Sequence, residues 1–380
     1  MEKLTIKLLT DTITEEELSV LQDLIKDKAN KKRFENLLRA NLYLDLNNNW
    51  NTENAFDKVL AKIAQEEKPV KKLIPSWIKY VAASVVILIA STLYFNNKLN
   101  IDSDTISETQ NSTIIVAGTN KATLTLETGV DVALEKGKKY SNKNVESSGE
   151  ALIYNNKPTA KEDIQYNYLT IARGGQFFLE LSDGTKVWLN SESKLKYPVN
   201  FPKNKTREVE LVYGEAYFEV SPSTQHNGSK FKVNNAFQNI EVLGTQFNVK
   251  AYKEDLVITT SLVEGKVKIE NNFTGSMLKP GEASYVNIET KSLTVEKTDI
   301  ESAIAWKNGY FMFKNETLEA MVITLSRWYN VDFSFENSAK KNLRFTGILN
   351  RSDNVNSLLQ KIEKTDEASF VIENNNIIIK

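Results

Sequence analysis

The sequence predicts a multidomain protein: a small all-α bundle, one transmembrane helix, an all-β domain that forms a sandwich or a solenoid-like stack, and a small α+β domain. Three observations lead to this fold class. Residues 80–97 carry no charge, polar and apolar side chains alternate from about residue 112 to 297, and helical and strand patterns alternate after residue 305. We place the four parts at residues 1–74, 75–97, 98–304 and 305–380.

The composition excludes several classes of function. The 380 residues include 48 basic and 49 acidic side chains, so no global charge attracts nucleic acid. There is no cysteine and only one histidine, which excludes disulfides, thiolate nucleophiles, cysteine-bound zinc and multi-histidine metal centres. We therefore expect no cofactor, no metal, no direct contact with nucleic acid, no small-molecule substrate and no enzymatic activity.

Residues 1–74 have the pattern of three short helices. Thr14 and Glu17 have the spacing of a capping box at the start of the first helix. The apolar residues that follow at helical spacing are Leu18, Leu21, Leu24 and Ile25. A bundle this small gains stability by burying an apolar stripe on a partner, which makes these four residues candidate binding residues. The alternative is that they pack inside the bundle.

The uncharged run from Tyr80 to Asn97 predicts a transmembrane helix. At about 1.5 Å per residue it spans about 27 Å, close to the thickness of a hydrocarbon core. Aromatic residues flank it, with Trp77 and Tyr80 at one end and Tyr94 and Phe95 at the other, as is typical at the water interface. The alternative is a buried core helix.

The flanking charges predict the orientation of this helix. Lysines precede it at positions 62, 68, 71, 72 and 79, whereas only Lys98 follows closely. Because positive charge is retained inside, the N-terminus is expected in the cytoplasm and the part after about residue 98 outside it. In a bacterium with two membranes this predicts a single-pass inner-membrane protein whose C-terminal part is periplasmic.

The all-β domain begins with an internal repeat. Residues 122–134 match the segment that starts at Phe177, and the match aligns Gly129 with Gly184. Each copy is predicted to be a β-hairpin with its turn at the glycine.

After residue 305 the predicted order is strand, helix, strand, strand, helix, strand, with the helices on one side of a sheet. The first helix has one apolar face, formed by Leu318, Met321, Val322, Leu325, Trp328 and Tyr329. The terminal run Asn376–Lys380 is a candidate free edge strand, because no further chain follows to cover it.

Other residues admit a functional interpretation and a structural one. The pairs Glu215 with Glu219 and Glu208 with Glu210 could be glycosidase carboxylates, but their spacing favours exposed strand faces. Four aromatic residues could form a sugar platform but read more simply as sheet packing: Trp188, Tyr213, Tyr217 and Phe218. His226 is expected in a solvated loop.

An ordered set of motifs resembles the periplasmic domain of FecR-type anti-sigma factors. The motifs are LSDGTKVWLNSESKLKYP, REVELVYGEAYFEV, EVLGTQFNVKAY, LVEGKVKI and LKPGEA. The ending, WKNGYFMF with TLEAMVITLSRWYNVDF, resembles the C-terminal domain found in the Bacteroidetes branch of that family. The resemblance covers about residues 112–380.

The resemblance implies a signal relay. A TonB-dependent outer-membrane transporter senses its ligand, and its periplasmic signalling domain contacts this chain. An extracytoplasmic-function sigma factor in the cytoplasm, held by Leu18, Leu21, Leu24 and Ile25, is then released or activated. The domain 305–380, which is similar to transporter signalling domains, is expected to receive the signal, or else to cap the open end of the β-domain.

The resemblance also singles out the bond between Gly244 and Thr245. In some FecR-like regulators the corresponding bond breaks by itself, when the threonine hydroxyl attacks the preceding carbonyl. The alternative is a glycine bulge in a strand. Two functions of other classes also stay open, a membrane-tethered periplasmic scaffold and a glycan-binding protein.

Overall fold

The computed structural model describes Leu4 and residues 14–27, 115–155, 164–271 and 274–380. The predicted transmembrane helix, with Tyr80 and Phe95, and the second and third predicted N-terminal helices lie outside these residues. Within the described part of the chain, no helix is both long and apolar enough to cross a membrane. The chain divides into two compact units, residues 1–34 with 48–112 and residues 35–47 with 113–380.

The first unit contains helix α2 (Glu15–Leu24), and its N-terminus confirms the predicted capping box. The Thr14 hydroxyl accepts the Glu17 N–H at 3.3 Å, and the Glu17 carboxylate accepts the Thr14 N–H at 3.2 Å. These reciprocal bonds satisfy N–H groups that a helix start leaves without intrahelical partners.

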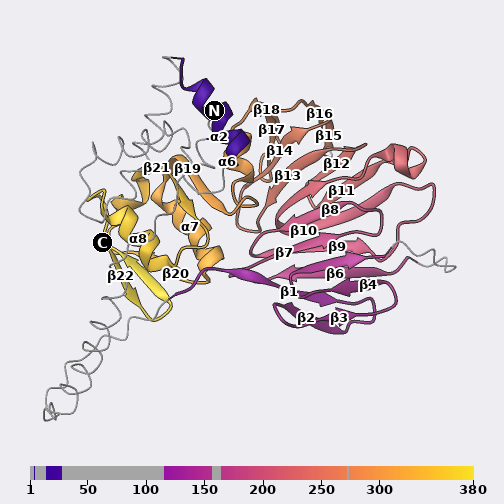
Figure 1. Cartoon of the computed structure of the whole chain (residues 1–380), viewed down its shortest axis with the longest axis horizontal. Coiled ribbons are helices and arrows are strands. Elements are labelled where there is room, and N and C mark those ends of the chain that lie inside the picture. Colours follow the sequence, from indigo (N-terminus) through magenta and orange to yellow (C-terminus); the bar gives the residue numbers. More distant parts are fainter. Residues whose placement is uncertain (1–3, 5–13, 28–114, 156–163, 272–273) are drawn as a thin grey trace, which may run out of the picture. The chain divides into compact units, whose positions relative to one another are not determined.

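The second unit contains a β-domain whose 18 strands form one hydrogen-bonded network, which divides into two sheets that share β10 (Arg207–Glu219) (Figure 1). The first sheet has the order β2 (Asp131–Glu135), β1 (Thr119–Thr125), β6 (Tyr166–Ile171), β9 (Ser193–Pro198), β10 (Arg207–Glu219), β11 (Phe231–Asn235), β12 (Gln238–Val242), β15 (Val267–Glu270) and β16 (Gly275–Leu278). Among these pairs only β10 with β11 is parallel.

The second sheet has the order β3 (Tyr140–Ser141), β4 (Val145–Ser147), β5 (Ala151–Tyr154), β7 (Gly175–Glu180), β8 (Lys186–Leu189), β10, β13 (Gln246–Ala251), β14 (Val257–Glu264), β17 (Glu282–Asn287) and β18 (Leu293–Lys297). A short helix, η1 (Ser223–His226), follows β10.

Strand β10 belongs to both sheets because it bends at Gly214. Its first half pairs with β9 and β11, and Gly214–Glu219 pair with β13. Gly214 has a φ of +99°, and a Cβ there would lie 2.4 Å from the Cα of Ser193. Only glycine fits this bend, since both the backbone conformation and the close approach exclude a side chain.

The inner faces of the two sheets form one hydrophobic core. Leu195 and Leu211 of the first sheet and Phe218 and Phe247 of the second are fully buried, and the two phenylalanine rings stack at 5.1 Å. Each such side chain contributes about 1.5–3 kcal/mol through burial. The β-domain is therefore a sandwich, one of the two predicted architectures.

The predicted internal repeat is confirmed. β1 and β2 form one hairpin, β7 and β8 form the other, and all are antiparallel pairs. The N–H of Gly129 bonds to Leu126 O and the N–H of Gly184 bonds to Leu181 O, both at 2.8 Å. Both glycines have a positive φ, which explains why glycine recurs at this position.

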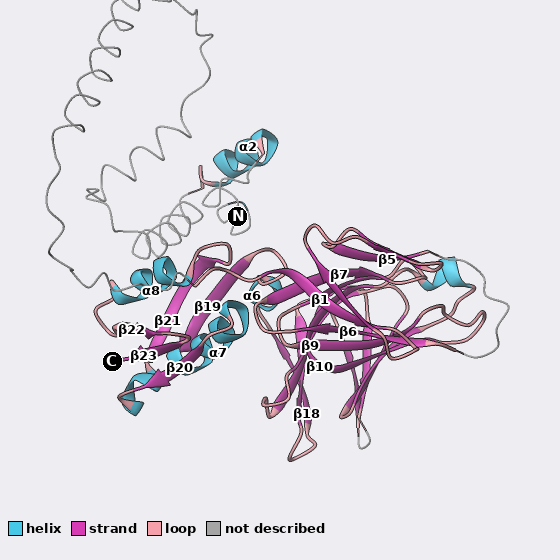
Figure 2. Cartoon of the chain, turned by 90° about the horizontal axis from the view of Figure 1, so that it is seen from below, coloured by secondary structure: helices cyan, strands magenta, loops and turns pink. Residues whose placement is uncertain are grey.

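Helix α6 (Ile300–Ile304) leads to the C-terminal domain, whose elements are β19 (Tyr310–Thr317), α7 (Leu318–Tyr329), β20 (Asp332–Phe335), η2 (Ser338–Asn342), β21 (Arg344–Asn350), α8 (Val355–Glu363), β22 (Phe370–Glu373) and β23 (Asn376–Ile379) (Figure 2). All six residues of the predicted apolar face of α7 are buried. One hydrophobic cluster joins α7 and α8 to the strands.

The sheet predicted for this domain differs from the observed arrangement. The strands form two sheets, β19 with β21 and β20 with β23 and β22, instead of a single sheet with helices on one side. The last predicted strand is a hairpin, β22 and β23, that turns at Asn374 with a φ of 55°. Two helices can cover either two small sheets or one larger sheet. Sequence periodicity does not distinguish these two arrangements.

The prediction that Asn376–Lys380 forms a free edge is wrong. β23 is the central strand, parallel to β20 on one side and antiparallel to β22 on the other. Ile377 and Ile379 are fully buried. A run of β-branched residues gains most where both neighbours and one face are covered, so the chain end inserts between two strands.

Candidate functional site

The connection between the domains covers the outer face of the second sheet. Trp306 follows α6, and its Nε1 donates a hydrogen bond to Asn248 Oδ1 on β13 at 3.1 Å. The Lys307 ammonium lies 4.1 Å from the ring centre of Trp188 and 4.2 Å from that of Tyr217. Cation–π contacts of this kind contribute about 0.5–2 kcal/mol each. Lys307 of this connection therefore covers the rings of Trp188 and Tyr217.

The prediction of exposed carboxylates on β10 is wrong for Glu215. Its side chain is buried and accepts hydrogen bonds from Asn190 Nδ2 at 2.8 Å and Asn248 Nδ2 at 3.0 Å. Glu219 pairs with Lys307 at 2.8 Å, whereas Glu208 is exposed. Alternation predicts which side chains of β10 share a face, but not whether that face is covered. The connection between the domains covers the face that holds Glu215.

Arg351, which follows β21 in the C-terminal domain, reaches into the same region. Its guanidinium donates to Asn190 Oδ1 at 2.9 Å and to the Trp306 carbonyl at 3.0 Å. It also stacks on the Trp328 ring at 3.8 Å. Only 3% of Arg351 is exposed, and this burial lowers the pKa of its guanidinium to about 10.

Five residues thus close a ring of hydrogen bonds across the two domains: Arg351, Asn190, Glu215, Asn248 and Trp306. We call this set the junction ring. Each amide side chain uses its oxygen towards one neighbour and its nitrogen towards Glu215, so neither can rotate without losing a bond. The junction ring therefore fixes how the C-terminal domain sits on the β-domain.

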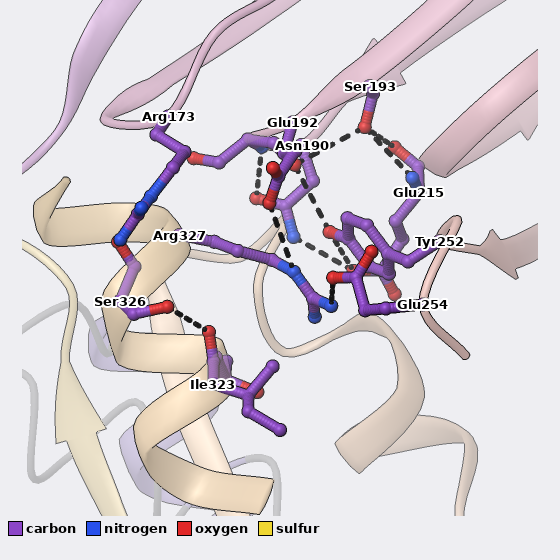
Figure 3. A network of polar contacts seen from close by, with 12 residues as sticks. Arg173, Asn190, Glu192, Ser193, Glu215, Tyr252, Glu254, Ile323, Ser326 and Arg327 are labelled. Carbon is purple, nitrogen blue, oxygen red and sulfur yellow. Dashed lines mark hydrogen bonds and ion pairs between the residues drawn. The ribbon is translucent and has the colours of Figure 1, made fainter. Parts of the chain in front are cut away.

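Arg327 of α7 forms a second contact beside the junction ring (Figure 3). It is buried, stacks on the Tyr252 ring at 3.6 Å, and bonds to the Glu254 carboxylate. The Glu192 carboxylate lies 3.4 Å from Arg327 Nε, and the Asp255 carboxylate lies 3.7 Å from Arg327 Nη2. Three carboxylates from loops of the β-domain thus face one cation of the C-terminal domain.

Arg173, between β6 and β7, holds the C-terminal end of α7 (Figure 3). Its guanidinium donates to the Ser326 carbonyl at 3.1 Å and to the Val331 carbonyl, and pairs with Asp332 at 2.8 Å. Cations near a helix C-terminus satisfy carbonyls that have no intrahelical donor. The sequence analysis missed Arg173, since its partners lie more than 150 residues away in the chain.

A cavity of about 460 Å³ adjoins the junction ring. It lies between the outer face of the second sheet, α6, β19 and α7, and its polar lining includes Lys250, Thr259, Ser261 and Lys314. Within the described ranges, no group of three or more histidine, aspartate or glutamate side chains is arranged to hold a metal ion. Because the junction-ring residues line it, the cavity belongs to the contact between the two domains.

The ion pair of Glu254 gives the junction a dependence on pH. Burial opposes ionisation of Glu254, but the hydrogen bond and charge of Arg327 outweigh it, so its pKa falls below 4.5. When folding lowers the pKa of a carboxyl group, the ionised group stabilises the folded protein at pH values above its ordinary pKa. This stabilisation is lost as the pH falls through the lowered pKa of the folded state.

We therefore expect Glu254→Gln to lower the melting temperature at neutral pH by a few degrees at most, because the Glu254 side chain is 53% exposed. Melting curves of the full chain in detergent should show that this difference shrinks as the pH falls below 4.5 and is lost once the pH has passed the lowered pKa of Glu254. A difference that persists in acid would mean that the ion pair is not its cause.

The bond between Gly244 and Thr245 lies in the bend between β12 and β13, just before the register shift that β13 makes with β14 at Gln246 and Phe247. Thr245 is buried, and its hydroxyl donates to the Lys266 carbonyl at 3.0 Å. A hydroxyl held in this way points its proton to a weakly basic carbonyl rather than to a general base.

We expect the purified chain to stay whole during long incubation, as judged by gel electrophoresis and intact mass. Thr245→Ala should behave in the same way. A new fragment that begins at Thr245 in the wild type, and its absence in Thr245→Ala, would contradict this expectation.

The structure also describes the predicted residues of α2 and His226. In α2, Leu21 is fully buried, while Leu18, Leu24 and Ile25 are half-buried. His226 lies in η1 and is partly exposed; its Nε2 lies 2.8 Å from the Ser221 hydroxyl, and partial burial lowers its pKa.

Comparison with known proteins places these domains. The family model described as FecR protein matches residues 167–268, and the model described as FecR, C-terminal matches residues 310–379. Two crystal structures of a candidate anti-sigma factor from Parabacteroides distasonis ATCC 8503 are similar, each with 26% sequence identity and a TM-score of 0.50. Each comparison covers 56% of this chain and 98% of the other. No curated protein matches.

The two matched segments lie within the two domains that the junction ring joins. The first runs from β6 to β15 of the sandwich, and the second runs from β19 to β23. Their order along the chain is that of the motifs quoted from the sequence. With both FecR domains present in this order, the chain belongs to the FecR family.

Proposed function

We propose that this protein is a single-pass inner-membrane anti-sigma factor. It relays a signal from a TonB-dependent outer-membrane transporter to an extracytoplasmic-function sigma factor in the cytoplasm. The observation that carries the proposal is the pair of FecR domain matches, together with the similarity to a candidate anti-sigma factor. The uncharged run at residues 80–97 and its basic N-terminal flank support the membrane topology.

The geometry of the junction supports a relay. Signal transfer needs an element with two discrete arrangements, and contacts made of buried polar groups hold strongly in one geometry and weakly in any other. Arg327 and Arg351 carry the C-terminal domain's side of these contacts, and Glu254 and Glu215 carry charges of the β-domain. The C-terminal domain is thus the part that a transporter would displace.

The sigma-factor arm of the proposal is tested by binding. A two-hybrid screen against the extracytoplasmic-function sigma factors of the source organism should find one that binds the full chain. A chain that lacks residues 1–74 should lose this binding. Deletion of residues 305–380 should preserve binding and abolish the transcriptional response to the transporter's ligand. Sigma binding without residues 1–74 would refute the assignment of the N-terminal part.

The membrane topology is tested by reporter fusions. A phosphatase that is active only outside the cytoplasm should work when fused after residue 110 and fail when fused after residue 70. The reason is that the lysines before the predicted span hold that side in the cytoplasm. Activity at residue 70 and none at residue 110 would overturn the orientation.

A further inference from the structure

The segment Ile115–Gly118, which precedes β1, is embedded in the C-terminal domain although it leads into the β-domain. We call it the strap. Ile115 is only 8% exposed and belongs to the hydrophobic cluster that contains α7 and α8. Its carbonyl accepts the N–H of Val355, the first residue of α8, at 3.2 Å. The next residue, Val116, is 67% exposed.

Gly118, the last residue of the strap, still lies against the C-terminal domain, since a Cβ there would be 2.7 Å from the ring of Trp328 in α7. The chain is fixed to the β-domain from the next residue on. Immediately afterwards the Thr119 N–H bonds to the Gly174 carbonyl at 3.1 Å, and β1 then pairs with β7, β2 and β6. The N–H of Gly174 in turn bonds to the Arg327 carbonyl at 2.7 Å.

The strap is too short to permit separation of the domains while both of its ends stay in place. Four residues extend at most about 14 Å from Ile115 to Thr119. Larger displacement of the C-terminal domain must therefore free one end. The end at Ile115 is held by the side chains of Ile115 and Ala117 and by one backbone hydrogen bond, whereas β1 is held by ladders to three strands. The end at Ile115 is the weaker one.

We infer that the strap is a conformational switch: the C-terminal domain buries Ile115 while it is docked at the junction ring and releases it when a partner draws the domain away. The direction of the signal rests on the proposed function, but the coupling between docking and burial of the strap does not. In the chain, the strap lies between the predicted membrane span and the β-domain.

The absence of cysteine allows a direct test in the full chain, since any introduced cysteine is the only thiol. Ile115→Cys and Val116→Cys are a matched pair, being adjacent in sequence and opposite in exposure. In the purified full chain in detergent, we expect a maleimide to label the Ile115→Cys variant at least about tenfold more slowly than the Val116→Cys variant. The reason is that labelling of a buried thiol requires local opening. Equal rates would overturn the inference.

Opening of the junction should then abolish the difference. Arg173→Ala together with Arg351→Ala removes contacts from both domains. We expect this double variant to raise the labelling rate at position 115 about tenfold or more and to leave position 116 within about twofold. Hydrogen exchange at the Gly174 amide, which bonds to the Arg327 carbonyl, reports separation independently. If hydrogen exchange at the Gly174 amide becomes faster while labelling at position 115 stays slow, the coupling is overturned. It is also overturned if neither the exchange rate nor the labelling rate changes.

A second variant covers the case in which the double variant fails to fold. Gly118→Ala forces a methyl group against Trp328 and should raise labelling at position 115, whereas Val116→Ala at the exposed neighbour should not. Equal effects of the two variants would contradict the inference. These measurements need no sigma factor or transporter, so their failure is distinguishable from failure of the proposed function.

Discussion

Glu215→Gln is expected to lower the free energy of unfolding by about 2–4 kcal/mol. The substitution keeps the shape but replaces one acceptor oxygen with an NH₂ group. That group would face Asn190 Nδ2 or Asn248 Nδ2, both of which are donors. Neither asparagine can turn over without cost, because its own oxygen already accepts a bond from Arg351 or Trp306.

The measurement is equilibrium unfolding of the full chain in detergent, followed by tryptophan fluorescence. Glu208→Gln is the matched control, since Glu208 lies on the same strand but is exposed. We expect the control to stay within about 0.5 kcal/mol of the wild type. An equal loss for both variants would show that the junction ring does not depend on the charge of Glu215.

Leu24→Asp is expected to weaken sigma-factor binding by about 100-fold or more, because a charge placed in an apolar interface must be desolvated without a partner. Leu18→Asp should act in the same direction. Both residues are half-buried on α2, so each has surface left for a partner. Affinity is measured by titration of the full chain with the sigma factor found in the screen.

Leu21 must be treated separately in this test. It is fully buried, so Leu21→Asp would disrupt the packing of α2 and would not report on a partner. Ser19→Asp is the control, because this position is exposed on the same helix. Circular dichroism should show that Leu24→Asp retains the helix content of the wild type. Unchanged affinity in a helical Leu24→Asp variant would remove this residue from the proposed sigma-binding surface.

Local features of this protein were predictable from the sequence. The capping box of Thr14 and Glu17 and the glycine turns at Gly129 and Gly184 depend on residues a few positions apart. The apolar face of α7 follows in the same way from helical spacing. Period-two alternation predicted a strand-rich domain, because neighbouring side chains on a strand point to opposite faces.

The position of the strands depended on contacts between distant segments. The bend of β10 at Gly214 is determined by Ser193, and the central place of β23 by strands on both of its sides. Alternation states which side chains share a face, but it does not state whether another part of the chain covers that face. For this reason Glu215 was predicted to be exposed and is buried.

The sequence by itself thus determined the kinds of element, the repeated hairpins and the resemblance that leads to the FecR family. Only the tertiary structure decided the junction ring, the capping of α7 by Arg173 and the burial of Ile115 in the C-terminal domain. The partners in the junction ring lie up to 161 positions apart, as for Arg351 and Asn190. No local pattern records such a pairing, because it is decided by which surfaces meet when the two domains pack together.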